Sequence, residues 1–215
     1  LDELLMKVVE CWASLFSPRV VAYRRSRGVS AEPAIAVIVQ EMVDSDRSGV
    51  MFTADPSTGK QDRIVIEGAF GLGEVVVGGQ VEPDTYIVAK DGPRLLEARV
   101  GTKSHKIVRG KLGDERVDLT PEQSTRRVCS DEQIVDLALF ARIVDARSFS
   151  EAARRTGIAK SAVSRRMALL EERLGVQLLR RSTRALEVTS DGARFYEHCV
   201  KVLAAARGAA ASVSG

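Results

Sequence analysis

The sequence predicts an α+β fold over residues 1–130, followed by a mostly α-helical module over residues 131–215. Apolar runs with strand character alternate with Gly, Pro and Asp turns up to about residue 90, whereas segments with helical periodicity follow residue 131. The 215-residue chain has room for two small domains. Its 45% hydrophobic and 28% charged residues are the balance of a soluble globular protein.

The first half begins with a predicted helix over residues 3–27, which Pro18 interrupts and Gly28 ends. Strands are then predicted where apolar runs lie between turn-forming residues, at 34–43, 48–54, 62–69 and 84–90. Residues 110–127 are polar and rich in turn formers, so we expect a linker there. Pro121 after Thr120 favours a helix start, and a helix is expected from about Asp131.

The net charge of +3 is unevenly distributed along the chain. Residues 114–141 hold three basic and seven acidic side chains, whereas residues 142–184 hold eleven Arg or Lys and four acids. A run of one charge usually marks only a solvated surface. Here the basic block coincides with a helix-turn-helix pattern, and this coincidence favours nucleic-acid binding.

The helix-turn-helix pattern consists of three predicted helices within residues 136–175. Ser148 and Glu151 have the spacing of a capping box that opens the second helix, and Gly157 ends that helix. The third helix is expected to bury Val163, Met167, Leu170 and Leu174. Its early turns offer donors suited to base edges and phosphates in a major groove, namely Lys160, Ser161, Ser164, Arg165 and Arg166.

A short β wing is predicted after Gly175, from LLRRSTR and ALEVTSDG, with clustered arginines at positions 180, 181 and 184. Arginines on a wing bind phosphates or enter the minor groove. Residues 190–208 continue as a helix with one apolar stripe, formed by Phe195, Cys199, Val202, Leu203 and Ala206. This stripe either packs against another molecule or folds back on the first helix of the module.

Residues 137–203 resemble the winged helix-turn-helix of the LysR-type transcriptional regulators throughout their length. The resemblance implies sequence-specific DNA binding in transcription regulation, with contacts from Lys160, Ser161, Ser164, Arg165, Arg181 and Arg184. It also implies a linker helix at 190–208 that pairs with its two-fold mate, so the expected partners are double-stranded DNA and a second copy. Ala159 and Lys160 replace the usual Ser-Gln, which affects base preference. The plain alternative is a small helical bundle with a basic surface.

The runs AVIVQEMVDSDRSGVMFTADPSTG and IVIEGAFGLGEVVVGGQVEPDTY resemble the ATP-grasp nucleotide-binding domain of phosphoenolpyruvate synthase and pyruvate phosphate dikinase. The predicted fold class is therefore an α+β ATP-grasp fragment followed by a winged helix-turn-helix with a linker helix. The resemblance implies that Gln40 faces adenine. AFGLGE (69–74) is a glycine loop that could approach a phosphate, so Gly71, Gly73 and Glu74 complete the candidate nucleotide site.

The family places phosphate-binding Arg and Lys residues upstream of the matching segment and acidic metal ligands downstream, and this sequence has neither set. Leu1 in place of Met likewise predicts that the natural N-terminus lies further upstream. Phosphoryl transfer depends on positioning and on neutralised phosphate charge. We therefore expect weak or vestigial ATP binding, with Mg²⁺ only alongside the nucleotide, and no catalysis. The alternative function is an ATP-dependent phosphotransferase domain related to phosphoenolpyruvate synthase.

Residues 131–140 serve both resemblances with no Gly/Ser/Pro spacer between them. This arrangement favours a recombined or truncated reading frame, or a sequence-assembly junction, over a tuned two-domain sensor. Cys11, Cys129 and Cys199 are odd in number and lack CxxC spacing, so we expect reduced thiols, a cytoplasmic location and no metal site. No apolar run approaches the roughly 18 residues of a membrane helix.

Overall fold

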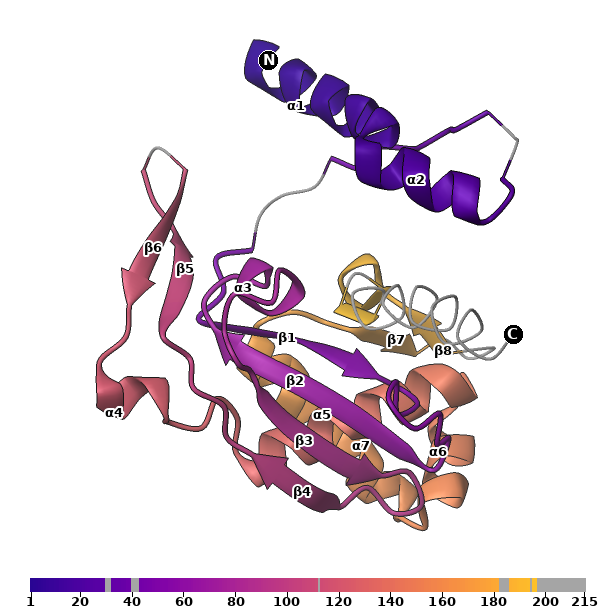
Figure 1. The fold of residues 1–215 in the computed structure, drawn as a ribbon. Helices are drawn as coiled ribbons and strands as arrows, with labels where there is room; N and C mark the ends of the chain where they lie inside the picture. Colours follow the sequence, from indigo (N-terminus) through magenta and orange to yellow (C-terminus); the bar gives the residue numbers. More distant parts are fainter. Residues whose placement is uncertain (30–31, 40–42, 112, 182–185, 194, 197–215) are drawn as a thin grey trace. The chain divides into compact units, whose positions relative to one another are not determined.

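The computed structural model describes residues 1–29, 32–39, 43–111, 113–181, 186–193 and 195–196. It separates into two compact units, residues 1–43 and 44–215 (Figure 1). The boundary that we predicted after residue 130 lies inside the second unit, at Ser130, which caps a long helix.

The first unit contains α1 (Asp2–Ala13), the 3-10 turn η1 (Ser14–Phe16) and α2 (Pro18–Ser26). Ser17 is extended and Pro18 opens α2, which confirms the predicted interruption. The strand predicted at 34–43 is wrong over its described part, because residues 32–39 form no regular element. Ile38 is 70% exposed and Val39 is 61% exposed, so two of the apolar residues that predicted this strand are not buried.

The second unit begins with an antiparallel sheet in the order β1-β2-β3-β4. Its strands are β1 (Arg47–Phe52), β2 (Arg63–Phe70), β3 (Asp84–Ala89) and β4 (Leu95–Arg99). The strands predicted at 48–54, 62–69 and 84–90 are confirmed. Alternation along β1 and β2 sends Val50, Phe52 and Val65 into a small cluster on one face. Met51, Ile64 and Ile66 enter the larger cluster on the other face.

Residues 110–127, expected to form a linker, contain regular structure. The strand β6 (Asp114–Asp118) pairs antiparallel with β5 (His105–Arg109), and α4 (Pro121–Ser124) follows. A reciprocal capping box between Thr120 and Gln123 fixes the start of α4. Every residue of β6 is exposed, so this strand forms by pairing and not by burial. A strand of that kind leaves no apolar alternation in the sequence, which explains why it was missed.

The helical part consists of α5 (Asp131–Ala146), α6 (Phe149–Thr156) and α7 (Lys160–Leu174), followed by β7 (Leu179–Arg181) and β8 (Leu186–Val188). These bounds confirm the predicted helix-turn-helix and the strands of the wing. Leu174, which we expected to be buried, is 42% exposed. It is the last residue of α7, beyond the final inward-facing position at Leu170, and Gly175 then ends the helix in the left-handed conformation.

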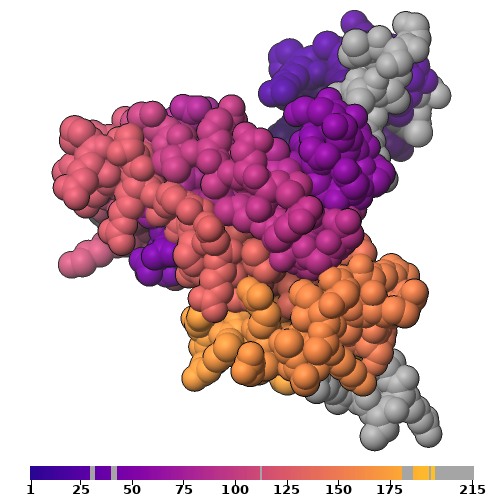
Figure 2. Space-filling view, turned by 90° about the horizontal axis from the view of Figure 1, so that it is seen from below, coloured from indigo at the N-terminus to yellow at the C-terminus, as the bar shows by residue number. Residues whose placement is uncertain are grey.

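Two hydrophobic cores share the helix α5. Ile134, Ala138 and Ala141 pack with the sheet residues, whereas Leu139, Phe140 and Ile143 pack with α6, α7 and β7. Leu137 touches both clusters. In Figure 2 the magenta surface of the sheet adjoins the orange surface of the helices. The sheet and the helix-turn-helix are therefore built on one element.

Asp84 is completely buried at the start of β3 and connects the sheet to the segment before α5. Its carboxylate forms an ion pair with the equally buried Lys103. It also accepts hydrogen bonds from the Val128 N–H at 2.7 Å and from the Tyr86 hydroxyl at 2.9 Å. The Tyr86 oxygen in turn accepts from the Cys129 N–H at 3.1 Å. Burial raises the pKa of Tyr86 to about 12, so this hydroxyl remains a donor.

No helix in the described part of the chain combines the length and the apolar character that crossing a membrane requires.

Replacing Asp84 should destabilise the second unit strongly. Asp84→Ala leaves the buried ammonium of Lys103 without its counter-charge, and the expected loss is about 3–5 kcal/mol of unfolding free energy. Urea denaturation followed by circular dichroism measures this loss. Asp118→Ala is the control, because the Asp118–Arg116 ion pair is largely exposed and contributes little. Equal losses in the two variants would contradict the assigned role of Asp84.

Candidate nucleic-acid interface

The turn between α6 and α7 is fixed by backbone geometry. Gly157 ends α6 at φ 67°, and the Ile158 N–H donates to the Ala153 carbonyl at 3.2 Å. Ala159 then caps α7, which begins at Lys160. Val163, Met167 and Leu170 turn one face of α7 into the core, so the opposite face of its first turns is directed outward.

The predicted DNA-contacting residues of α7 lie on this outward face. Lys160, Ser161 and Arg165 are exposed. Ser164 is half-buried in a hollow of about 350 Å³ between α7 and the wing, which Arg180 also lines. The structure therefore brings three of the predicted residues together on one accessible helical surface and places the fourth at its margin.

Arg166 lies on the same early turns of α7, but its role is structural. Its Nε lies 2.7 Å from Oδ1 of Asp136, a buried carboxylate on α5. The second oxygen of Asp136 lies 3.5 Å from Nη1 of Arg173. Two arginines of α7 are thus held against α5 and withdrawn from the outward face. Sequence reasoning missed Asp136, although an acidic residue between the apolar positions Ile134 and Ala138 was a usable signal.

The capping box predicted for α6 forms only in part. The Ser148 hydroxyl accepts from the Glu151 N–H at 3.2 Å, but the Glu151 side chain binds guanidinium groups of the same helix. Its Oε1 lies 2.6 Å from Nη2 of Arg154 and 2.6 Å from Nε of Arg155. Hydrogen bonds from Arg154 and then from Arg155 lower the pKa of Glu151 to about 2. Two cationic partners on the same helix thus take the place of the single backbone N–H of a full capping box.

A carboxylate of α7 anchors the wing. Oε1 of Glu171 accepts from the N–H groups of Leu178 and Leu179, both at 2.8 Å. Across the ribbon, Leu179 pairs with Val188, and the Thr189 hydroxyl donates to the Gln177 carbonyl at 2.6 Å. These bonds fix where β7 leaves the core, and so they set the direction of the strand that carries Arg180 and ends at Arg181. Arg184 lies outside the described residues.

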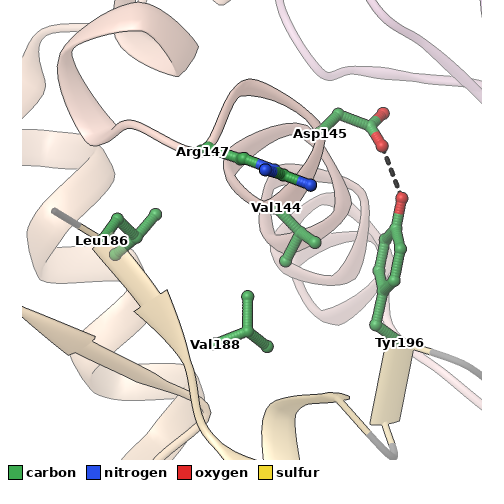
Figure 3. A pocket seen from close by; sticks show the side chains of 6 residues that line it. All are labelled: Val144, Asp145, Arg147, Leu186, Val188 and Tyr196. Carbon is green, nitrogen blue, oxygen red and sulfur yellow. Dashed lines mark hydrogen bonds between the residues drawn. The ribbon is translucent and has the colours of Figure 1, made fainter.

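The described start of the predicted 190–208 helix contacts α5. Residues 190–193 and 195–196 are helical. The Phe195 and Phe140 rings meet edge to face with centroids 5.3 Å apart, and the Tyr196 hydroxyl donates to Asp145 (Figure 3). A hollow of about 510 Å³ lies there between the end of α5 and β8. The described start of this helix therefore packs on α5, the first helix of the module, as the second of the two predicted arrangements requires. The stripe residues at 199, 202, 203 and 206 lie outside the described residues.

The glycine loop at 69–74 does not present free amides to a phosphate at its centre. The Gly71 N–H donates to the Asp46 carbonyl and the Leu72 N–H donates to the Ile107 carbonyl, both at 2.8 Å. Gly71 has φ 80°, and a Cβ atom there would lie 2.2 Å from the Ile107 oxygen. This glycine is therefore required for close backbone packing.

The remaining candidates for nucleotide binding fit an ATP site no better. Gly73 caps the short helix α3 (Glu74–Val77). The exposed Glu74 carboxylate accepts from the Gln80 amide at 3.4 Å. Gln40 lies outside the described residues. Within the described ranges, no group of His, Cys, Asp and Glu side chains is arranged to hold a metal ion.

Residues 1–150 match the family "Pyruvate phosphate dikinase, AMP/ATP-binding domain". The chain belongs to this family. Residues 134–193 match a second family, "Bacterial regulatory helix-turn-helix protein, lysR family". The two matches overlap over residues 134–150, most of which belong to α5.

Curated relatives match the first part of the chain. A probable phosphoenolpyruvate synthase of Archaeoglobus fulgidus is 41% identical over 145 residues, which are 67% of this chain and 19% of that protein. A probable phosphoenolpyruvate synthase of Methanothermobacter thermautotrophicus is 46% identical over 142 residues, which are 66% of this chain and 21% of that protein. The chain therefore spans about a fifth of the length of these relatives.

Solved structures match the last part of the chain. A complex of the BenM DNA-binding domain with catB site 1 DNA is 34% identical, covering 37% of this chain and 88% of that one, with a TM-score of 0.30. The virulence activator AphB of Vibrio cholerae, a member of the LTTR family, is 32% identical. That match covers 36% of this chain and 27% of AphB, also with a TM-score of 0.30.

Replacing Glu171 should loosen the wing specifically. Glu171→Ala leaves the partly buried amides of Leu178 and Leu179 without their acceptor, at an expected cost of about 1–3 kcal/mol. Hydrogen exchange of these two amides should accelerate relative to amides in the middle of α5. Glu172→Ala, at the exposed neighbouring position of α7, serves as the control. Unchanged exchange at residues 178 and 179 in Glu171→Ala would refute this anchoring role.

Proposed function

We propose that this chain binds double-stranded DNA sequence-specifically and regulates transcription through the surface formed by α7 and the wing. The observation that carries the proposal is the exposure of Lys160, Ser161 and Arg165 on the first turns of a helix whose opposite face is buried. The match of residues 134–193 to the LysR-type helix-turn-helix supports it. A helix that presents donors at its N-terminal end suits the major groove.

Within this interface the residues take different roles. Lys160, Ser161 and Arg165 reach base edges from α7, and Ser164 contributes at the margin next to the wing. Arg181 and Arg184 bind phosphates, which adds affinity without base readout. We further propose that the protein acts in the cytoplasm and pairs with a second copy through residues 190–208. Pairing would place two recognition helices on one duplex.

The second proposal concerns the nucleotide. The family of the first part is an AMP/ATP-binding domain. We propose that ATP binding by this chain is weak or vestigial and does not support phosphoryl transfer. The support is geometric, because the central amides of the glycine loop already donate to Asp46 and Ile107. A phosphate there would have to displace the bonds that fix the loop to β5 and to Asp46, just before β1. The alternative, a phosphotransferase domain with Mg²⁺ beside the nucleotide, would require a different arrangement of this loop.

DNA binding is tested by fluorescence anisotropy with bacterial promoter duplexes at 50 and 200 mM salt. We expect affinity that falls steeply with salt. Arg165→Ala and the double variant Arg181→Ala/Arg184→Ala should each weaken binding by roughly tenfold or more. Lys111→Ala, an exposed cation on the β5–β6 ribbon, should bind like the unaltered chain. A folded chain that shows no binding at 50 mM salt would overturn the proposal.

ATP binding is tested by thermal unfolding with and without millimolar Mg-ATP. Because the glycine-loop amides are engaged, we expect little or no rise in the unfolding temperature. A large rise that is lost in Gln40→Ala would show a working nucleotide site instead and would favour the phosphotransferase alternative. Mg-GTP at the same concentration controls for general effects of the polyphosphate.

A further inference from the structure

The turn that joins β3 to β4 lies against the helix-turn-helix (Figure 1). Gly92, at its tip, has φ 79°, and a Cβ atom there would lie 3.3 Å from the carbonyl oxygen of Thr156, the last residue of α6. The Ala89 N–H donates to the Arg94 carbonyl at 3.0 Å and closes the turn, and Pro93 is buried. The contact thus has a defined geometry that favours glycine at this position.

The charged side chains of this turn differ in how far they are buried. Lys90 is half-buried. Burial lowers its pKa and the positive charge of Arg142 lowers it further, while Asp145 opposes the shift. The Arg94 side chain is exposed, and no hydrogen bond or ion pair is found for its guanidinium group among the described residues. Asp91 is exposed as well and contributes the opposing charge.

The contact of this turn with Thr156 links the turn that carries Arg94 to the start of the recognition helix α7. The β3–β4 turn meets α6 at Thr156, and only residues 157–159 separate Thr156 from Lys160, the first residue of α7. A helix end inserted in a major groove, which is about 12 Å wide, has phosphates on both sides of it. Arg154 and Arg155, in the last turn of α6, add positive charge next to Thr156, and both pair with the carboxylate of Glu151.

We propose that Arg94 binds a phosphate of the same duplex that α7 contacts, so that the sheet of the ATP-binding-domain family forms part of the DNA interface. This inference rests on the proposed DNA binding. A phosphate contact positions the duplex and adds affinity without reading bases. The exposed carboxylate of Asp91, next to Gly92 in the same turn, would repel that phosphate. The DNA footprint of this chain therefore extends beyond the residues that match the LysR-type module.

The test measures the affinity of the full chain for one promoter duplex, and for a scrambled duplex, at several salt concentrations. Arg94→Ala should weaken binding to both duplexes by the same factor, roughly three- to tenfold, and should lower the slope of affinity against salt by about one ion. Asp91→Asn should strengthen binding to both. Arg99→Ala removes the same charge at the opposite end of β4, where Arg99 donates to Thr85, and should leave affinity unchanged.

The outcomes separate this inference from the proposed function. If the unaltered chain binds and Arg165→Ala weakens it while Arg94→Ala and Asp91→Asn match the unaltered chain, the DNA interface ends at the helix-turn-helix and the inference fails alone. Equal effects of Arg94→Ala and Arg99→Ala would mean that only net charge matters, which also overturns it. If no duplex binds to the unaltered chain, both proposals fail.

Discussion

The buried carboxylate of Asp84 sets the relation between the two halves of the second unit. It neutralises Lys103 inside the protein and accepts from the backbone of Val128, just before α5 begins. A buried charge is stable only when it is paired and its remaining positions are hydrogen-bonded. Each partner of Asp84 is therefore held in place, and the same contacts fix the direction in which α5 leaves the sheet. Because α6, α7 and the wing pack on α5, the recognition surface takes its position from this side chain.

The helix α5 explains how one segment satisfies two families. A helix that is apolar on one side only can support one core, whereas α5 buries residues on both sides. The sheet covers Ala138 and Ala141, and the helix-turn-helix covers Phe140 and Ile143. The absence of a spacer, from which we predicted a recombined or truncated reading frame, corresponds in the structure to this shared helix. A flexible linker would have separated the two hydrophobic cores, which here both pack against α5.

The sequence predicted those elements whose periodicity reflects burial. The strands near 48–54, 62–69 and 84–90 and the helices around Ser148 and Lys160 were found because each buries an alternating or helical stripe. The exposed strand β6 was missed for the opposite reason. In the candidate site the sequence identified the exposed donors of α7. It could not show that Arg166 turns toward Asp136, because that choice depends on a residue of another helix.

The sheet order also has a consequence for how copies of the chain behave in solution. Of the described strands, β1 pairs only with β2, and Val50, Met51 and Phe52 give it no charged side chain over half its length. An apolar strand at the border of a sheet is a template for adding a strand from another molecule. The opposite border, β4, carries Glu97 and Arg99, which discourage such addition. Self-association at high protein concentration would therefore begin along β1, independently of any pairing that DNA requires.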